Sequence, residues 1–138
     1  MEIGEMTPGE LPAVLAMMRA LWPEAGDYDF SDERVFVSRR PDGTLDGFAS
    51  MSLRPWAEGC TSTPCPYIEG WWVSPDVRGR GIGRALFDAI ENWCRAHGYT
   101  ELASDVELEN TSSLAAHAAL GFEPTLRLQF FRKSLCPA

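Results

Sequence analysis

Residues 67–86 read YIEGWWVSPDVRGRGIGRAL, and this stretch decides the fold that we predict. Its first seven residues are rich in aromatic and β-branched side chains, which is typical of a buried strand. Ser74 and Pro75 end that strand, and a turn with three alternating glycines follows. Apolar residues then recur at helical spacing to about His97. The stretch therefore predicts a strand, a glycine turn and a helix.

The remaining segments surround this unit with further strands and helices. Thr7 is the expected N-cap of a first helix, which Pro23 ends. In chain order we expect strands at residues 1–6, 34–40, 45–53, 67–73, 100–106 and 126–133, and helices at residues 7–22, 82–97 and 111–120. The order β-α-β-β-β-α-β-α-β indicates one α/β domain over residues 1–138, with a mixed central β-sheet flanked by helices.

The charge balance narrows the class of ligand. Twenty acidic residues against twelve basic ones give a net charge of −8, which argues against a nucleic-acid partner because such binding needs a basic surface. A negative field instead attracts cations, although the same charge is also found in proteins that it merely keeps soluble. Five acids without a base share one short segment: Glu24, Asp27, Asp29, Asp32 and Glu33. This segment favours a cationic ligand.

Length, hydropathy and cysteine content indicate the class of protein and its compartment. A chain of 138 residues has the length of one ordinary domain, and no stretch reaches the roughly 20 apolar residues that a membrane helix needs. Its first residues are acidic where a signal peptide would be basic, so we expect a cytoplasmic protein without a membrane partner. The four cysteines form no C-x-x-C pair and the two histidines lack zinc-site spacing, so we expect neither disulfides nor a metal.

The glycine turn indicates a phosphate ligand. Alternating glycines let the backbone curl so that several N–H groups point at one place, and the following helix adds the positive end of its dipole. Arg78, Arg80 and Arg84 add positive charge. This combination suits a pyrophosphate, although an ordinary tight turn with solvated arginines has the same pattern.

The spacing Arg78-x-x-Gly81-x-Gly83 resembles the Arg/Gln-x-x-Gly-x-Gly/Ala signature of the GCN5-related N-acetyltransferases (GNAT). The predicted element order is similar to theirs, and the His117-x-x-x-Gly-Phe ending resembles their Tyr-x-x-x-Gly-Phe. The resemblance implies acetyl-CoA as co-substrate, with its pyrophosphate in the glycine turn and its thioester oxygen near the backbone N–H groups around Trp72 and Val73. The cofactor-binding residues that it implies are Trp71, Trp72, Val73, Arg78, Gly79, Arg80, Gly81, Ile82, Gly83, Arg84 and Asn110.

A narrower resemblance covers nearly the whole chain, which is similar to the aminoglycoside 6'-N-acetyltransferases of the short, dimeric kind. The matching pieces are Leu21-Trp22-Pro23, Gly59-Cys60, Ser62, Pro64, Glu69-Gly70, Ala103-Ser104-Asp105, Glu109-Asn110-Thr111, His117, Ala119-Leu120-Gly121-Phe122 and Phe130-Phe131-Arg132-Lys133. The resemblance implies an enzyme that acetylates the 6'-amine of an aminoglycoside and so confers antibiotic resistance. It also implies a homodimer, whose subunits in some relatives exchange C-terminal strands.

Glu69 and Asp105 are the candidate acceptor carboxylates. If the strands at 67–73 and 100–106 are neighbours, both side chains face one cleft. A glutamate inside such an apolar strand is costly to bury without a partner, which favours a functional role over a solvated one. The alternative for Asp105 is a helix-entry cap. The resemblance implies that both residues bind the aminoglycoside and that Asp105 is a general base.

His117 and two tryptophans complete the candidate site. His117 occupies the position of the superfamily tyrosine and is the natural candidate to protonate the leaving thiolate; the alternative is a histidine packed on the helix flank. Trp22 matches a substrate-lining tryptophan of the resembled enzymes, and Trp56 stands where relatives have tyrosine, although core packing is the common role of a lone tryptophan. Relatives carry another acid where this chain has Leu126.

Two other functions fit parts of the same pattern. A related acetyltransferase acting on a polyamine or a protein amine would share every acetyl-CoA feature and differ only in the acceptor cleft. A non-catalytic module that binds acyl-CoA or the drug would bind both ligands without turnover. A substitution at Asp105 separates this module from an enzyme, because only the enzyme would lose a rate.

Overall fold

The computed structural model describes residues 1–137 of the chain. Its strands are β1 Glu2–Glu5, β2 Arg34–Arg39, β3 Leu45–Arg54 and β4 Cys65–Val73. Its α-helices are α1 Leu11–Leu21, α2 Ile82–Ala96 and α3 Thr111–Ala119, and single 3-10 turns occupy Pro8–Glu10, Pro23–Ala25 and Pro75–Val77. The predicted helices and the first four predicted strands are confirmed, with small shifts at their ends.

The start of α1 shows how local sequence and tertiary contacts agree. The Glu10 carboxylate accepts the backbone N–H of Thr7 at 2.8 Å, which is half of a capping box. Arg39 of β2 donates to the same carboxylate at 2.6 Å, and this hydrogen bond lowers the pKa of Glu10 to about 2. The beginning of the helix is thus attached to the sheet.

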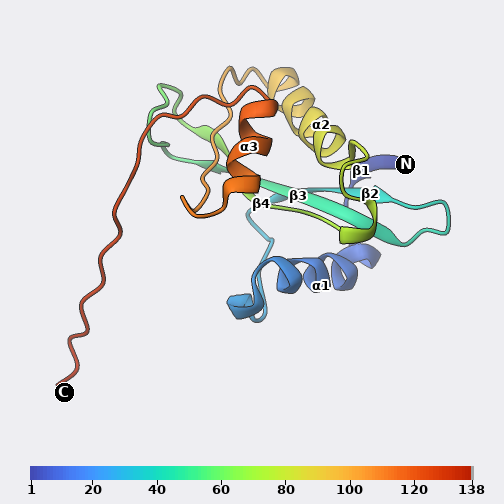
Figure 1. The fold of residues 1–138 in the computed structure, drawn as a ribbon. Coiled ribbons are helices and arrows are strands. Elements are labelled where there is room, and N and C mark those ends of the chain that lie inside the picture. Colours follow the sequence, from blue (N-terminus) through green and yellow to red (C-terminus); the bar gives the residue numbers. More distant parts are fainter. Residues whose placement is uncertain (138) are drawn as a thin grey trace.

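The four strands form one sheet in the order β1-β2-β3-β4, and each neighbouring pair is antiparallel. Helix α1 lies against one face of this sheet, whereas α2 and α3 lie on the opposite side (Figure 1). The core under α1 includes Val14, Met18, Val37 and Phe48, and the core under α2 includes Met51, Leu86, Phe87 and Ile90. Both faces of the sheet are therefore covered.

A β-bulge interrupts the pairing of β3 with β4. Ser50 pairs with Gly70, but the next residue, Met51, pairs with Ile68, so Glu69 has no opposite residue. A bulge bends its strand and redirects the side chain of the extra residue, and such features are common beside functional sites. The bulge therefore sets the direction of the Glu69 carboxylate.

The strand predicted at residues 100–106 is reduced to a single parallel bridge between Ala103 and Tyr67. The N–H of Ile68 donates to Ala103 O and the N–H of Ala103 donates to Pro66 O, both at 2.9 Å. No further bridge to β4 forms beyond Ala103 in the described residues, because the two segments diverge. The predicted mixed sheet is thus an antiparallel sheet with one parallel bridge at its edge.

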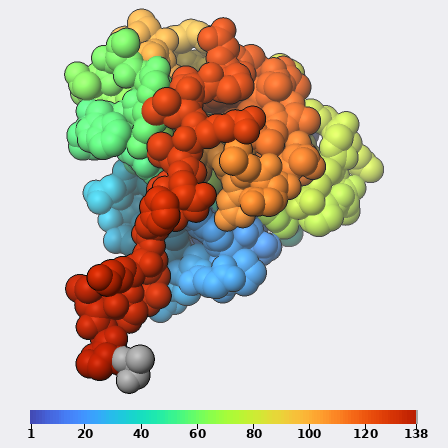
Figure 2. Space-filling model, turned by 60° about the vertical axis from the view of Figure 1, so that its left-hand side comes forward, coloured from blue at the N-terminus to red at the C-terminus, as the bar shows by residue number. Residues whose placement is uncertain are grey.

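The strand predicted at residues 126–133 is absent from the described chain. Residues 123–137 form an extended segment, which we call the C-terminal arm, and its later part runs away from the body (Figures 1 and 2). Phe130 is 82% exposed and Phe131 is 91% exposed. A strand needs a neighbour for its backbone hydrogen bonds, and the arm has no sheet edge of its own subunit beside it. In residues 1–137, no helix has both the length and the apolar character needed to cross a bilayer.

Candidate active site

The glycine turn forms an open backbone cradle at the start of α2. Gly79 and Gly81 have φ angles of 80° and 87°, a region that side-chain-bearing residues rarely occupy. Nothing lies within 4 Å of the position that a Cβ would take at either glycine. Helix α2 carries no acid in its first turn, so its N-terminal N–H groups and dipole remain available to an anion. The turn has the open shape and the polarity that a pyrophosphate requires.

The three arginines of the turn differ in their contacts. Arg78 Nε donates to Val73 O at 2.8 Å, and Arg84 Nη2 donates to Ala119 O at 2.9 Å, at the end of α3. These two side chains hold neighbouring elements together. Arg80 makes no hydrogen bond or ion pair within residues 1–137 and lines a hollow of about 300 Å³. Arg80 is thus the arginine that is most free to meet a phosphate.

The end of β4 presents backbone groups to an open sheet edge. Ser74 N–H donates to Asp46 O of β3 at 2.8 Å, so it faces β3. Backbone groups alternate along a strand, so the N–H of Trp72 also faces β3, whereas the N–H groups of Trp71 and Val73 face the open side. The available donors are therefore those of Trp71 and Val73, and Trp72, which we expected as a donor, faces β3 instead.

Trp71 links this edge to the glycine turn. A Cβ added at Gly83 would lie 2.8 Å from the Trp71 ring, so the glycine lets α2 pack closely on the indole. The indole Nε1 is buried and has no hydrogen-bond partner in the described residues. A buried donor without a partner is costly, and a polar group of a ligand lying along β4 is one way to satisfy it.

Glu69 is held by two residues of β3. Arg54 donates to it from Nε at 2.9 Å and from Nη2 at 2.7 Å, and the Ser52 hydroxyl donates at 2.6 Å. Burial alone would raise the pKa of Glu69, but the hydrogen bonds from Arg54 and Ser52 outweigh it, and the pKa is lowered. Glu69 is therefore a fixed carboxylate at neutral pH.

Tyr67 connects the two candidate acceptor carboxylates. Its hydroxyl donates to Asp105 Oδ2 at 2.5 Å, and the Arg54 guanidinium lies 3.5 Å from the centre of its ring. Burial and the neighbouring Asp105 raise the pKa of Tyr67, so the hydroxyl stays protonated and donates. A continuous chain of contacts thus runs from Glu69 through Arg54 and Tyr67 to Asp105, on the side of the sheet that α1 covers.

Sequence reasoning did not single out Tyr67, Arg54 or Ser52. Alternation along the strand is a signal that points to Tyr67, because residues two apart share a face with Glu69. Arg54 meets Glu69 across strands and 15 residues away, so its role depends on the bulge and the register. No local pattern carries that information.

The two candidate tryptophans lie at the ends of their elements. Trp22 follows α1 and is 48% exposed, and Trp56 follows β3 and is 64% exposed. These exposures argue against core packing for either indole. Both rings are accessible to a ligand.

Asn110 and His117 belong to α3. Asn110 is the N-cap of this helix and accepts the Ser113 N–H at 3.1 Å, so its carbonyl oxygen is already engaged. His117 lies between α3 and β4, where its ring contacts Trp71 edge-on with centres 5.7 Å apart. Its two nitrogens bond to Ser113 O and Ser104 Oγ, each at 2.8 Å. His117 is thus packed and hydrogen-bonded at the same time.

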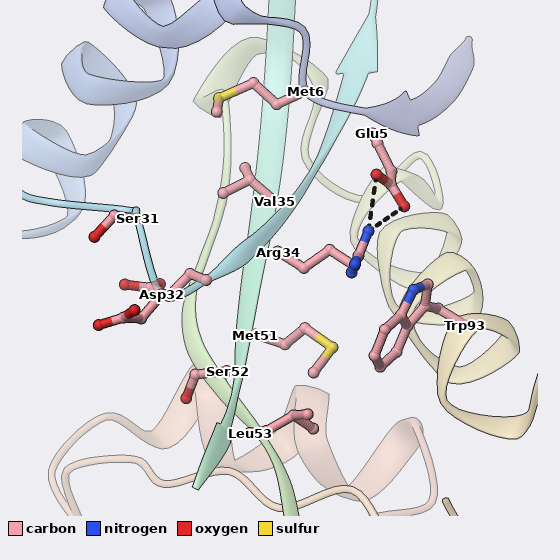
Figure 3. A pocket seen from close by; sticks show the side chains of 11 residues that line it. Glu5, Met6, Ser31, Asp32, Arg34, Val35, Met51, Ser52, Leu53 and Trp93 are labelled. Carbon is pink, nitrogen blue, oxygen red and sulfur yellow. Dashed lines mark hydrogen bonds and ion pairs between the residues drawn. The ribbon is translucent and has the colours of Figure 1, made fainter. Parts of the chain in front are cut away.

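A hollow of about 450 Å³ opens beside the cluster around Glu69, where β2 begins and β3 ends (Figure 3). On one side Arg34 lies 4.7 Å from the ring centre of Trp93 and pairs with Glu5 at 2.9 Å. Glu33 and Ser52 line it as well. Because Ser52 also donates to the acceptor carboxylate, the hollow adjoins the candidate acceptor site.

Glu33, the last acid of the segment at residues 24–33, lies near the cluster around Glu69. Its Oε2 accepts the Tyr28 hydroxyl at 2.5 Å, whereas its Oε1 is buried and makes no hydrogen bond within the described chain. Burial raises the pKa of Glu33, and the nearby charges of Glu69 and Asp29 add to this effect. The folded environment therefore disfavours the charged form of Glu33 relative to water.

Replacing Glu33 with glutamine is expected to stabilise the protein at neutral pH, with a rise in Tm on the order of 3 °C. Because the pKa of Glu33 is higher in the folded protein than its ordinary value of 4.5, deprotonation of Glu33 lowers the free energy of unfolding. This loss develops as the pH rises from 4.5 through the folded pKa. The neutral amide still accepts from Tyr28 and avoids this loss. The gain should therefore disappear below pH 4.5, as thermal unfolding at several pH values would reveal. Asp32→Asn, an exposed neighbour, is the control, and a lower Tm for the glutamine variant would contradict the prediction.

Within residues 1–137, no group of three or more histidine, cysteine or acidic side chains is arranged to hold a metal ion. The four cysteines are free thiols, at positions 60, 65, 94 and 136. The candidate site consists of the glycine turn, an open strand edge and a pair of carboxylates on the far side of that edge.

Comparison with known proteins identifies the family of this chain. The model of the acetyltransferase (GNAT) family matches residues 11–122. The chain belongs to this family. GNAT membership confirms the resemblance that the glycine turn and the element order predict, and it agrees with the cradle geometry described above.

The most informative GNAT relatives share one name. Aminoglycoside N(6')-acetyltransferase type 1 of Klebsiella aerogenes is 39% identical over 134 residues, which cover 88% of each chain. The enzyme of that name from Stenotrophomonas maltophilia is 39% identical over 145 residues, covering 99% of this chain and 95% of the relative. The solved structure of AAC(6')-Iy with the bisubstrate analogue CoA-S-monomethyl-acetylneamine is 34% identical and matches with a TM-score of 0.86, over 96% of this chain and 97% of that one.

Proposed function

We propose that this protein is an acetyl-CoA-dependent aminoglycoside 6'-N-acetyltransferase, which would confer resistance to the drug. The observation that carries the proposal is the pair Glu69 and Asp105, whose carboxylates are joined through Tyr67 and Arg54 beside the open edge of β4. A polycationic sugar needs such carboxylates to hold its ammonium groups. The names of the relatives and the bound analogue of AAC(6')-Iy support the same substrate.

Acetyl-CoA would lie along the glycine turn and the open edge of β4. The pyrophosphate would take the N–H groups of residues 79–83, with Arg80 as a free cation. The pantetheine arm would run past Trp71 and α3, and Asn110 retains its side-chain N–H₂ for this contact. The outward N–H groups of Trp71 and Val73 are the donors that would receive the thioester oxygen as it becomes negative.

The reaction joins an amine and a thioester in few steps. The 6'-amine attacks the thioester carbonyl as a neutral group, and Asp105 takes or orients its proton. Glu69, fixed by Arg54 and Ser52, holds an ammonium group of the same sugar and thereby orients the attacking amine. Trp22 and Trp56 offer exposed rings to the cationic sugar, a contact worth about 0.5–2 kcal/mol.

The subunits would form a homodimer, with the C-terminal arm of each as part of the interface. The arm carries large exposed apolar side chains, namely Leu126, Leu128, Phe130, Phe131 and Leu135. A patch of this kind is unusual on a monomer surface and marks an interaction site. We expect the protein to act in the cytoplasm, where acetyl-CoA is available.

Two other functions remain as alternatives, and an assay of thiol release separates them from the proposed one. A GNAT enzyme for a polyamine or a protein amine would keep the acetyl-CoA features and reject aminoglycosides. A non-catalytic module would bind acetyl-CoA and the drug without releasing thiol. Carboxylates beside the open edge suit a polyamine as well as an aminoglycoside, so the names of the relatives and the bound analogue of AAC(6')-Iy are what favour the aminoglycoside.

The deciding experiment measures thiol release from acetyl-CoA with a 6'-amino aminoglycoside and with a matched 6'-hydroxy one. Turnover with the amine alone is the expected result and would establish the position that is acetylated. Turnover with both drugs would move the acetylated position elsewhere on the sugar. Release with neither drug, while acetyl-CoA still binds, would refute the proposed substrate; turnover with a polyamine would then favour the first alternative.

A further inference from the structure

Ser104 and Asp105 are consecutive residues that face opposite sides of the opening beside β4. Asp105 accepts the hydroxyl of Tyr67, on the side where Glu69 and Arg54 lie. Ser104 meets His117 of α3 on the other side. Successive side chains of an extended segment alternate in this way. One short segment thus carries a carboxylate towards the acceptor side and a hydroxyl towards the side of the glycine turn and Trp71.

The hydrogen bonds of His117 define where its protons reside. Nδ1 lies 2.8 Å from Ser113 O, and a carbonyl oxygen only accepts, so Nδ1 carries a proton. In the neutral ring Nε2 then accepts the hydroxyl of Ser104 at 2.8 Å. In the imidazolium Nε2 donates to the Ser104 oxygen instead, and the hydroxyl hydrogen is free to point elsewhere. Both charge states keep the same two contacts.

Aromatic rings surround His117 on its other sides. The ring centres of Trp71, Phe87 and Phe122 lie 5.7, 6.2 and 5.2 Å from its own, all in edge-on arrangements. These contacts fix the plane of the imidazole, which is half-buried. The Ser104 oxygen is the hydrogen-bond partner of Nε2 within the described residues, so the serine hydroxyl can pass a proton to or from this nitrogen.

We propose that Ser104 is the group that protonates the leaving thiolate of coenzyme A, with His117 acting through it as the source of the proton. The proposal rests on the acetyl transfer described above. The attacking amine enters from the Asp105 side, so the thiolate leaves towards the opposite side, where Ser104 and Trp71 lie. His117 is a positioning residue in this scheme because its ring meets the serine rather than the sulfur.

Protons and electrons are conserved in this step. When the tetrahedral intermediate collapses, the C=O bond re-forms, the C–S bond breaks and its electron pair stays on sulfur. The Ser104 hydroxyl gives its proton to the sulfur while its oxygen takes the Nε2 proton of the His117 imidazolium. The products are the amide, the free thiol, an intact serine and a neutral imidazole protonated on Nδ1. Solvent returns a proton to Nε2 before the next turnover.

The test is a double-mutant cycle of Ser104→Ala and His117→Phe, assayed by thiol release with a 6'-amino aminoglycoside. Phenylalanine keeps the edge-on packing with Trp71 and Phe122 but has no nitrogen. We expect each single variant to lower kcat about 100-fold with KM for both substrates unchanged, and the double variant to fall no further. The solvent deuterium isotope effect on kcat should change in all three variants, which a purely structural role would not produce. Thr44→Ala, in the exposed turn between β2 and β3, is the control with unchanged kcat.

The outcomes separate this step from the function on which it rests. Wild-type turnover with an unchanged kcat for Ser104→Ala would overturn the serine as proton donor and leave the acetyltransferase intact. Additive losses in the double variant would overturn the coupling of the two residues. No thiol release by the wild-type protein would refute the proposed function and this step together. Acetyl-CoA binding and thermal unfolding of each variant establish that it is folded.

Discussion

Asp105→Asn is expected to lower kcat/KM for a 6'-amino aminoglycoside by at least about tenfold, through a higher drug KM or a lower kcat. The amide oxygen still accepts the Tyr67 hydroxyl, so the local structure is retained. The negative charge is lost, however, and with it both the attraction for an ammonium group and the capacity to take a proton. Steady-state kinetics of thiol release measure the effect.

The controls for this prediction lie in the same loop. Glu107→Gln and Glu109→Gln remove equally exposed charges that make no side-chain contact with the acceptor cluster, and they should leave kcat/KM nearly unchanged. The KM for acetyl-CoA should be that of the wild type in every variant, because Asp105 faces away from the glycine turn. An unchanged kcat/KM for the Asp105 variant would remove this residue from the site and would favour the non-catalytic alternative.

Removing residues 126–138 is expected to convert a dimer into a monomer. Within the described residues, the one side-chain hydrogen bond between the arm and the body is that of Thr125, whose hydroxyl donates to Glu58 O at 3.3 Å. Phe130 and Phe131 are almost fully exposed there, and an apolar segment of this kind is stable in water only when a partner covers it. Sedimentation velocity over a range of concentrations measures the change in mass.

Point variants separate the role of the apolar side chains from that of chain length. The double variant Phe130→Asp and Phe131→Asp should dissociate the dimer as the truncation does. Arg132→Ser, which changes an exposed polar neighbour in the same arm, should leave it assembled. A monomeric wild-type protein, or a dimer that survives the truncation, would exclude the arm as the interface.

Much of the site follows from local sequence because its geometry is local. The glycines of the turn adopt positive φ angles that require no distant partner, and α2 follows from the apolar spacing after them. The sequence also predicts that Glu69 and Asp105 lie near each other, because this needs only that residues 67–73 and 100–106 are neighbours. The parallel bridge between Ala103 and Tyr67 confirms that these segments are neighbours, although one bridge forms instead of a strand.

Other features depend on register and on contacts between distant segments. The bulge at Glu69, the bidentate Arg54 and the Tyr67 link arise because β3 and β4 pair with one residue skipped. The predicted strand at 126–133 failed for a related reason. An alternating apolar pattern favours a strand, but the strand forms only where a sheet edge accepts its hydrogen bonds.

The sequence by itself therefore determined the glycine turn, the helices and the residue types of the candidate site, because these depend on backbone freedom and on spacing along the chain. The tertiary structure alone decided which side chains meet. It turned Ser104 and Asp105 to opposite sides of one opening and gave Ser104 a histidine 13 residues away. Contacts between separate segments depend on how the strands pair and diverge, and a linear pattern does not contain that information.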